Sequence, residues 1–175
     1  PESGGKFGDA LASLGTGSDR DLIVGAPAED GGGTNDAGRA YVVDGATIGG
    51  TVNRTPMTSA NRETTGRFGF SVSSIGDRSG DGTPDVLVGA PDETVSSTGD
   101  AGRAYVLNNS DGAVLATITS PSLEDGRFGE SVVGAGQPVV GASLEDAGSN
   151  SEAGRAHTFL PTISFADGRA SAEPY

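Results

Sequence analysis

The residues of this sequence best suited to chemistry are oxygen-bearing side chains that alternate along one short segment. They are Asp77, Ser79, Asp81, Thr83 and Asp85, with Gly82 at the sixth place of the run. Oxygen ligands at every second position match the preference of Ca²⁺, and the glycine permits the sharp turn of a loop around an ion. Carboxylates confined about 5 Å apart repel one another unless a cation lies among them. The segment therefore predicts a calcium site, with a solvated acidic turn as the alternative.

An EF-hand is excluded as the form of this site. The twelfth position of an EF-hand loop carries a bidentate Glu, and that place is taken here by Val88, inside an apolar run. The acidic loop lies between two short apolar segments that have the length and residue types of β-strands. We therefore expect two strands, rather than two helices, to support the loop.

Catalytic chemistry finds little support in the sequence. The chain has no cysteine and a single histidine, His157, which stands where two similar segments have Tyr41 and Tyr105. This predicts a position on the surface of a strand for His157 rather than a role as general base. Ser131 follows the pattern of Ser71, and no activating His and carboxylate accompany it. Composition alone leaves a glycosidase-like carboxylate pair open, but we predict that the chain is not an enzyme.

Composition and repetition indicate an all-β fold. The 175 residues include 30 Gly and 9 Pro, and short Val/Ile/Leu runs ending in Gly-rich turns recur where a helical period is absent. Three similar units, which we place at about 1–60, 61–120 and 121–175 of a single domain, open with Phe-Gly at Phe7, Phe68 and Phe128. Repeats of about 60 residues indicate a solenoid, a propeller or an array.

Each unit has room for about four short strands, which is the content of one propeller blade. In the middle unit the fourth strand is expected within 113–120. The recurring Phe ring is predicted to fill the wedge between adjacent blades, and the Gly beside it to permit close approach of two backbones. The Pro that follows Val-Gly-Ala is predicted to end a strand, because it has no N–H for the ladder.

Three motifs occur together in the middle unit. F-G-x-S-V begins at Phe68, G-D-x-x-G-D-G-x-x-D spans the acidic loop, and V-G-A-P ends at Pro91. This combination resembles the FG-GAP repeat of integrin α-subunit propellers and related secreted proteins. The resemblance implies β-propeller blades of four antiparallel strands, with Ca²⁺ in the loop between the first and second strands. It also implies a role in adhesion or ligand recognition, without catalysis.

The resemblance further assigns a role to each residue of the loop. Asp77, Asp81 and Asp85 would ligate through carboxylates, Ser79 through its side-chain oxygen and Thr83 through its backbone carbonyl. The outer units depart from this pattern, since the first keeps only Ser18, Asp19 and Asp21 and the third has Gly-Ala-Gly-Gln-Pro-Val in place of the loop. We therefore expect one cation site rather than three.

The blade count is a second departure. Closed propellers use about four to eight blades, and the three units here would leave apolar faces and strand edges uncovered. We expect the chain either to belong to a larger propeller or to self-associate, with a dimer giving a six-bladed ring.

Acidic loops precede the Ala-Gly-Arg-Ala turn of each unit, at 29–36, 92–100 and 145–152. They could form further cation sites, but we favour solvated hairpin loops in which the acid supports the turn. Arg39, Arg103 and Arg155 recur at one place in the unit, and we expect them to pair with nearby carboxylates.

The net charge of the chain and its first residue indicate which partners it binds and where it is located. With 24 acidic against 11 basic residues and a net charge of −13, electrostatics argues against nucleic acid and anionic membranes as partners. Lys6 is the single lysine, a bias that resembles proteins of high-salt environments, although acidity also suits solubility. The chain starts at Pro1, which indicates a processed or excised segment, and we infer an extracellular or cell-surface location. Sequons at Asn53 and Asn108 would permit N-glycosylation in an exporting host.

Together these observations predict an extracellular, calcium-stabilised, non-enzymatic propeller module for adhesion or recognition of a protein or glycan. One alternative is a structural subunit that polymerises into a filament or surface layer. A weaker alternative is the propeller accessory of a secreted hydrolase. No RGD-type motif or sugar-stacking aromatic cluster identifies the ligand.

Overall fold

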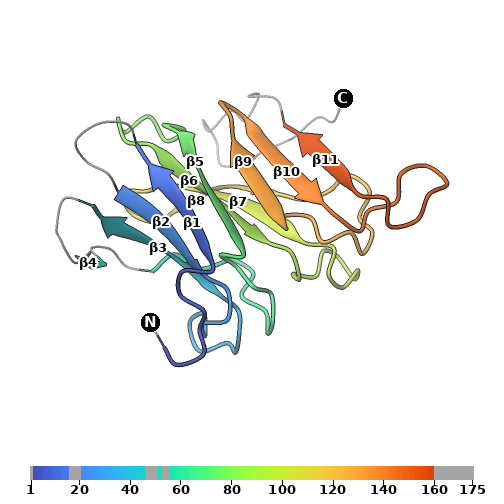
Figure 1. The fold of residues 1–175 in the computed structure, drawn as a ribbon, viewed down its shortest axis with the longest axis horizontal. Helices are drawn as coiled ribbons and strands as arrows, with labels where there is room; N and C mark the ends of the chain where they lie inside the picture. The colour runs from blue at the N-terminus through green and yellow to red at the C-terminus, as the bar shows by residue number, and fades with distance from the viewer. Residues whose placement is uncertain (1, 16–20, 46–50, 53–55, 160–175) are drawn as a thin grey trace.

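The computed structural model describes residues 2–15, 21–45, 51–52 and 56–159, and these ranges contain strands, turns and loops without a helix. The strands form three antiparallel sheets that lie side by side (Figure 1). The first sheet contains β1 (Ala10–Leu14), β2 (Asp21–Ala26), β3 (Arg39–Asp44) and β4 (Thr51–Val52). The second contains β5 (Ser71–Gly76), β6 (Asp85–Ala90), β7 (Arg103–Leu107) and β8 (Val114–Ile118). The third contains β9 (Ser131–Gly134), β10 (Pro138–Ala142) and β11 (Arg155–Thr158).

Within each sheet the strands follow one another in chain order, and each pairs with its antiparallel neighbours. β2 and β6 both end at the Ala that precedes a proline, Pro27 or Pro91, as the missing N–H of proline predicts. The prediction of an all-β fold built of four-stranded antiparallel propeller blades is confirmed, with three strands of the third blade lying in the described ranges. In the described part of the chain, no helix has the length and apolar character needed to cross a membrane.

Each sheet has two faces that pack differently. We call the leading face the one that packs on the preceding sheet; in the second sheet it carries the register-aligned row Val72, Val88 and Tyr105. We call the trailing face the one that packs on the following sheet; in the second sheet it carries Leu87 and Val106, which are register partners. β6 is buried along its whole length because a neighbouring sheet covers each of its faces.

The Phe of each Phe-Gly motif belongs to the leading face. Phe68 packs in the apolar core between the first and second sheets, Phe128 packs in the core between the second and third, and both are fully buried. Burial of one such ring contributes about 1.5–3 kcal/mol. The prediction that these rings fill the wedge between blades is thus confirmed for both internal junctions.

The glycine beside each ring is also explained by the packing. A Cβ added to Gly69 would lie 2.2 Å from the carbonyl oxygen of Arg39, and one added to Gly129 would lie 2.3 Å from that of Arg103. No side chain fits at such distances, so the predicted close approach of two backbones is confirmed at Gly69 and Gly129.

Candidate functional site

The acidic loop 77–85 joins the first and second strands of the middle sheet. Gly76 at the end of β5 pairs with Asp85 at the start of β6, so the two ends of the loop are held by the ladder. Gly80 and Gly82 have φ of 80° and 89°, a region that favours glycine, and they turn the loop back on itself. The five predicted ligand residues therefore lie in one short connection between two ordered strands.

Asp85 is the innermost member of the loop and is fully buried. Its Oδ2 accepts hydrogen bonds from the backbone N–H groups of Arg78 at 2.6 Å and Ser79 at 2.7 Å. Its Oδ1 accepts one from the N–H of Asn109 at 3.2 Å, which ties the loop to the turn that follows β7. Hydrogen bonds to both oxygens stabilise a buried carboxylate and fix its orientation.

Asp77 shapes the other side of the loop. Its two carboxylate oxygens accept hydrogen bonds from the N–H groups of Gly80 at 2.6 Å and Gly82 at 2.9 Å. The hydroxyl of Ser79 lies between two carboxylates, 3.4 Å from Oδ1 of Asp77 and 3.5 Å from Oδ1 of Asp85. The structure thus brings Asp77, Ser79 and Asp85 together.

Asp81 engages different partners. One carboxylate oxygen accepts hydrogen bonds from the Thr83 hydroxyl at 2.6 Å and the Thr83 N–H at 2.9 Å. The other accepts a hydrogen bond from the hydroxyl of Ser110 at 2.5 Å, in the turn between β7 and β8. The hydroxyls of Ser110 and then Thr83 hold the pKa of the Asp81 carboxyl well below its ordinary value.

The chemistry of the loop fits a hard cation, because it offers three carboxylates, two hydroxyls and backbone carbonyls within nine residues. Its geometry fits in part, since Asp77 and Asp85 share the Ser79 hydroxyl while Asp81 lies with Thr83 and Ser110. Among the residues that the structure describes, no three acidic or histidine side chains gather as a metal centre. Ligation by these five residues stays a prediction.

A second group of acidic residues is buried, although the sequence predicted solvated loops. Glu29, Glu93 and Glu145 are fully buried, so the prediction of solvated hairpin loops is wrong for these three carboxylates. Each has a partner on the third strand of its sheet: the Tyr41 hydroxyl for Glu29, the Tyr105 hydroxyl for Glu93 and the His157 ring for Glu145. The hydrogen bond to an aromatic or imidazole group offsets part of the cost of burying the carboxylate.

The pair of Glu93 and Tyr105 in the second blade shows how burial and charge shift pKa values. Burial raises the pKa of Glu93, although Tyr105 and Arg103 both donate to its carboxylate. Burial likewise raises the pKa of the Tyr105 hydroxyl, and the adjacent Glu93 charge raises it further. Arg103 pairs with Glu93 at 3.1 Å, which confirms the predicted pairing at this position.

Arg155 and His157 of the third blade differ from the predictions made from the sequence. Arg155 donates to the hydroxyl of Ser122 at 3.3 Å rather than to a carboxylate. At the equivalent place in the first blade, the Tyr41 hydroxyl and the charge of Glu29 raise the pKa of Arg39, although its Nε is buried without a hydrogen-bond partner among the described residues. His157 does not lie on the open surface: its side chain is 15% exposed, and Nε2 lies 2.6 Å from Glu145. The surface prediction for His157 is wrong because the ring replaces Tyr as the partner of a buried Glu.

The sequons fall at different places. Asn53 lies outside the described residues, and Asn108 is half-buried at the end of β7, where its side-chain oxygen accepts the N–H of Ser110 at 2.6 Å. Glycosylation at either position stays a prediction.

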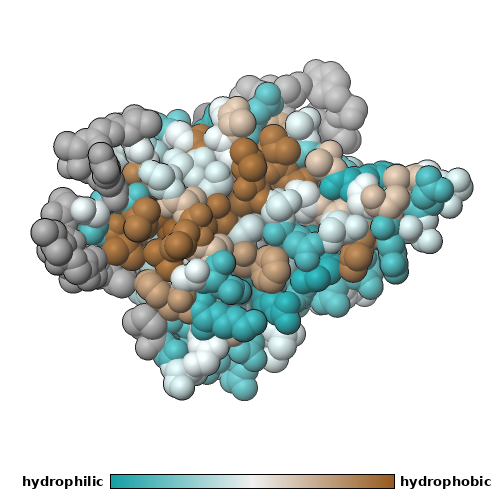
Figure 2. Space-filling model, in the orientation of Figure 1, coloured by the Kyte–Doolittle hydropathy of each residue, from teal (hydrophilic) through white to brown (hydrophobic). Residues whose placement is uncertain are grey.

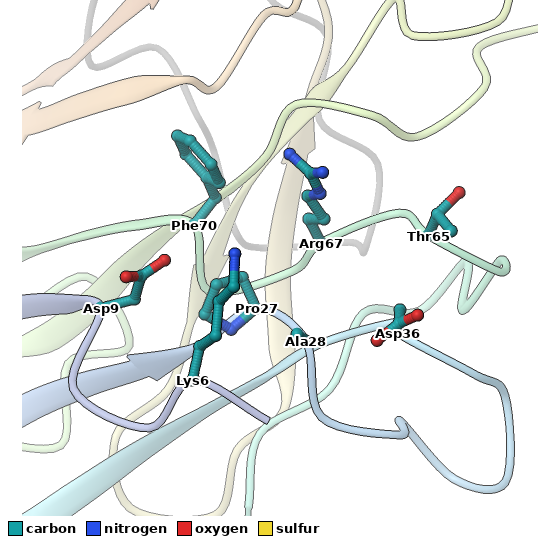
Figure 3. Close-up of a pocket in the computed structure, with 8 residues that line it drawn as sticks. All are labelled: Lys6, Asp9, Pro27, Ala28, Asp36, Thr65, Arg67 and Phe70. Atoms are coloured by element: carbon teal, nitrogen blue, oxygen red, sulfur yellow. The ribbon is translucent and has the colours of Figure 1, made fainter. Parts of the chain in front are cut away.

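A cavity of about 230 Å³ lies where the first and second sheets meet, away from the acidic loop. Lys6 and Asp9 from the chain before β1, Asp36 from the β2–β3 connection, and Arg67 and Phe70 from the chain before β5 line it. Figure 3 shows the Lys6 and Arg67 side chains extending in the same direction. No pattern in the sequence predicts this cavity, because its walls come from loops of two different blades.

Three adjoining antiparallel sheets, stacked through Phe-Gly motifs and repeated in chain order, are blades of the β-propeller class. The family model described as the FG-GAP repeat matches residues 68–107, from the Phe-Gly motif through the acidic loop to the end of β7. The chain therefore carries an FG-GAP repeat in its second blade, as the motifs predicted. No curated protein matches the sequence significantly.

Proposed function

We propose that this chain is a calcium-stabilised, non-catalytic FG-GAP propeller module that acts outside the cell in adhesion or ligand recognition. The observation that carries the proposal is the FG-GAP repeat at 68–107 with its loop of alternating oxygen ligands. FG-GAP repeats are typically extracellular, and the acidic composition of the chain suits a calcium-rich or saline medium.

Calcium is proposed to act on stability rather than on chemistry. Asp77 and Asp85 are already oriented by backbone N–H groups and lie on either side of the Ser79 hydroxyl. A cation that binds the folded loop and not the unfolded chain stabilises the fold by mass action. The loop also contacts the turn after β7 through Asp81 and Ser110, so the bound ion would fasten three strands of the second blade.

Recognition is proposed at the cavity between the first and second blades. Its walls combine the cationic groups of Lys6 and Arg67, the carboxylates of Asp9 and Asp36 and the ring of Phe70. Such a mixture of charged and aromatic groups in a concave site suits a polar ligand with an apolar part. The loops that line it belong to two blades, so the site depends on the packing of the propeller.

The absence of catalysis is proposed from the state of the candidate groups. The imidazole of His157 is engaged by Glu145, and neither Ser71 nor Ser131 is hydrogen-bonded to a histidine in the described structure. A serine nucleophile requires an adjacent base to take its proton.

Calorimetric titration with CaCl₂ tests the proposal. The unaltered chain should bind one Ca²⁺ and unfold at a higher temperature with calcium than with EDTA. Asp81→Ala should lose binding, while Asp125→Ala, which removes an exposed carboxylate outside the loop, should retain it. Equal calcium affinity for Asp81→Ala and the unaltered chain would refute the calcium site.

A further inference from the structure

The junction between neighbouring blades is built twice with the same backbone hydrogen bonds. The N–H of Phe68 donates to the carbonyl of Ala37 at 2.9 Å, and the N–H of Phe128 donates to that of Ala101 at 3.1 Å. One residue earlier, the N–H of Arg67 donates to Asp36 at 3.3 Å, and that of Arg127 donates to Asp100 at 2.9 Å. In both junctions the leading face supplies the donors and the trailing face supplies the acceptors.

The two junctions also share a glycine that lies against a backbone carbonyl of the next blade. A Cβ on Gly25 would lie 2.0 Å from the carbonyl oxygen of Gly69, and one on Gly89 would lie 1.9 Å from that of Gly129. Neither Gly25 nor Gly89 is among the residues with positive φ, so the local backbone conformation does not demand glycine there. Glycine is required at both positions because the next blade approaches so closely.

The third blade presents the acceptor half of this junction, and within the described ranges no donor meets it. The carbonyls of Glu152 and Ala153, which correspond to those of Asp100 and Ala101, receive no backbone hydrogen bond from the described residues. Gly141 occupies the place of Gly25 and Gly89, also without positive φ, yet no carbonyl of another blade lies near it in the described structure. The third blade therefore has the backbone of a trailing face that a further blade would cover.

The first blade presents the donor half. The N–H groups of Lys6 and Phe7, which correspond to those of Arg127 and Phe128, find no backbone acceptor among the described residues. A Cβ on Gly8 would meet nothing within 4 Å, whereas the corresponding Gly129 is closely packed. Phe7 is 37% exposed, while Phe128 is fully buried.

Apolar side chains on these two faces are more exposed than their counterparts at the internal junctions. Leu11 on the first leading face is 64% exposed, and its counterparts Val72 and Val132 are 9% and 8% exposed. On the third trailing face Val133 is 54% exposed. Figure 2 shows this apolar surface over β1 and β2 and again over β9. Among the described residues, the two faces that no blade covers are thus the two halves of the junction that the chain makes internally.

We propose that the third blade of one copy docks on the first blade of a second copy through this same junction, and that two copies close a ring of six blades. The donors at Lys6 and Phe7 of each copy would meet the acceptors at Glu152 and Ala153 of the other. A head-to-tail contact of this kind covers both ends of every copy only when the copies form a closed ring. Six blades lie within the range of about four to eight that closed propellers use. The proposal rests on the blade junction and not on the calcium loop or on ligand binding at the cavity, although Lys6 also lines that cavity.

Light scattering after size exclusion tests the assembly. The chain has a mass of 17.3 kDa, and we expect twice that mass in molar NaCl, where the repulsion between copies of net charge −13 is screened. Leu11→Glu should weaken dimerisation at least tenfold, while Val114→Glu, which adds the same charge at an exposed apolar side chain of the middle blade, should leave it unchanged. A monomer at every concentration would overturn the proposal, and a polymer longer than a dimer would overturn the closed ring.

A cysteine pair across the proposed junction gives a second, independent measurement. The chain contains no cysteine, so Lys6→Cys combined with Glu152→Cys introduces the two thiols alone. Their counterparts at the internal junctions, Arg67 with Asp36 and Arg127 with Asp100, are joined by a backbone hydrogen bond. Oxidation should yield a covalent dimer on a non-reducing gel, and Lys6→Cys alone should yield none. A monomer under oxidising conditions would contradict the junction, and a ladder of higher species would contradict closure.

Discussion

The hydroxyl of Tyr105 donates a hydrogen bond to the carboxylate of Glu93, which is fully buried between a turn and the third strand of the second blade. Arg103 supplies a second donor to the same oxygen, while the other carboxylate oxygen is buried without a hydrogen-bond partner in the described structure. A carboxylate satisfied on one side only is costly to keep ionised, which agrees with the raised pKa of Glu93.

Glu93 should therefore make stability depend on pH. A folded-state pKa above the ordinary 4.5 means that the folded chain holds the proton more tightly than the unfolded chain does. Its contribution is complete below pH 4.5 and is lost as the pH rises through the raised folded pKa. Relative to the Glu93→Gln variant, the unaltered chain should lose free energy of unfolding across that window, as measured by urea unfolding. Parallel pH profiles for Glu93→Gln and the unaltered chain would contradict the prediction.

Replacing the Phe of a Phe-Gly motif by Ala should lower the free energy of unfolding more where the ring is buried than where it is exposed. Phe68→Ala removes a fully buried ring from the core between blades and should lower the free energy of unfolding by about 3–5 kcal/mol. Phe7→Ala removes a ring that is 37% exposed, and in the dilute monomer we expect a cost of at most about half as much. Urea unfolding at low protein concentration provides the comparison, and equal costs would show that the leading face of the first blade is covered even in the monomer.

Gly89→Ala should force the second and third blades apart. The added Cβ would lie 1.9 Å from the carbonyl oxygen of Gly129, which is backbone and cannot rotate away. We expect a loss of about 3 kcal/mol in the free energy of unfolding. The matched change Gly99→Ala meets nothing within 4 Å at a residue without positive φ, so it should be neutral or stabilising by up to about 1 kcal/mol. Thermal unfolding of the two variants distinguishes them, and a neutral Gly89→Ala would refute the close approach.

Ser110 should control the ionisation of Asp81 across two turns of the blade. The hydrogen bond from its hydroxyl is the largest cause of the lowered pKa of Asp81, so Ser110→Ala should raise that pKa toward the ordinary 3.8. In the unaltered chain, the stabilising effect of Asp81 is present above its ordinary pKa and is lost as the pH falls through the lowered folded value. NMR titration of the carboxyl carbons without calcium measures the shift, with Ser151→Ala as a control in an exposed loop. An unchanged Asp81 titration would show that its pKa does not depend on the Ser110 hydroxyl.

The sequence predicted the features that depend on local pattern. The ends of β2 and β6 before proline and the position of the fourth strand near Val114 follow from short apolar runs and turn residues. The burial of Phe68 and Phe128 could also be predicted, since a ring that recurs at the same place in each repeat has the same environment wherever a preceding blade exists.

The burial of the three glutamates could not be predicted in this way. Glu29, Glu93 and Glu145 occur in stretches rich in Asp, Gly and Ser, which are typical of solvated loops. Each is hydrogen-bonded to a ring 12 residues further along, on the third strand of its sheet, and the composition of the loop does not report that contact. Their repetition with Tyr41, Tyr105 and His157 was visible, however, and a recurring acid at a constant distance from a recurring ring is the signal that could have found them.

The backbone hydrogen bonds at the blade junctions have a consequence for how such a protein can change in length. Each blade brings its own donors on one face and its own acceptors on the other, so a duplicated unit inserted at a junction would find both neighbours already compatible with it. Gain or loss of a whole unit thus leaves every remaining junction intact, whereas a partial insertion breaks one. Modular growth by whole units is built into the main chain and leaves the exposed loops free to diverge.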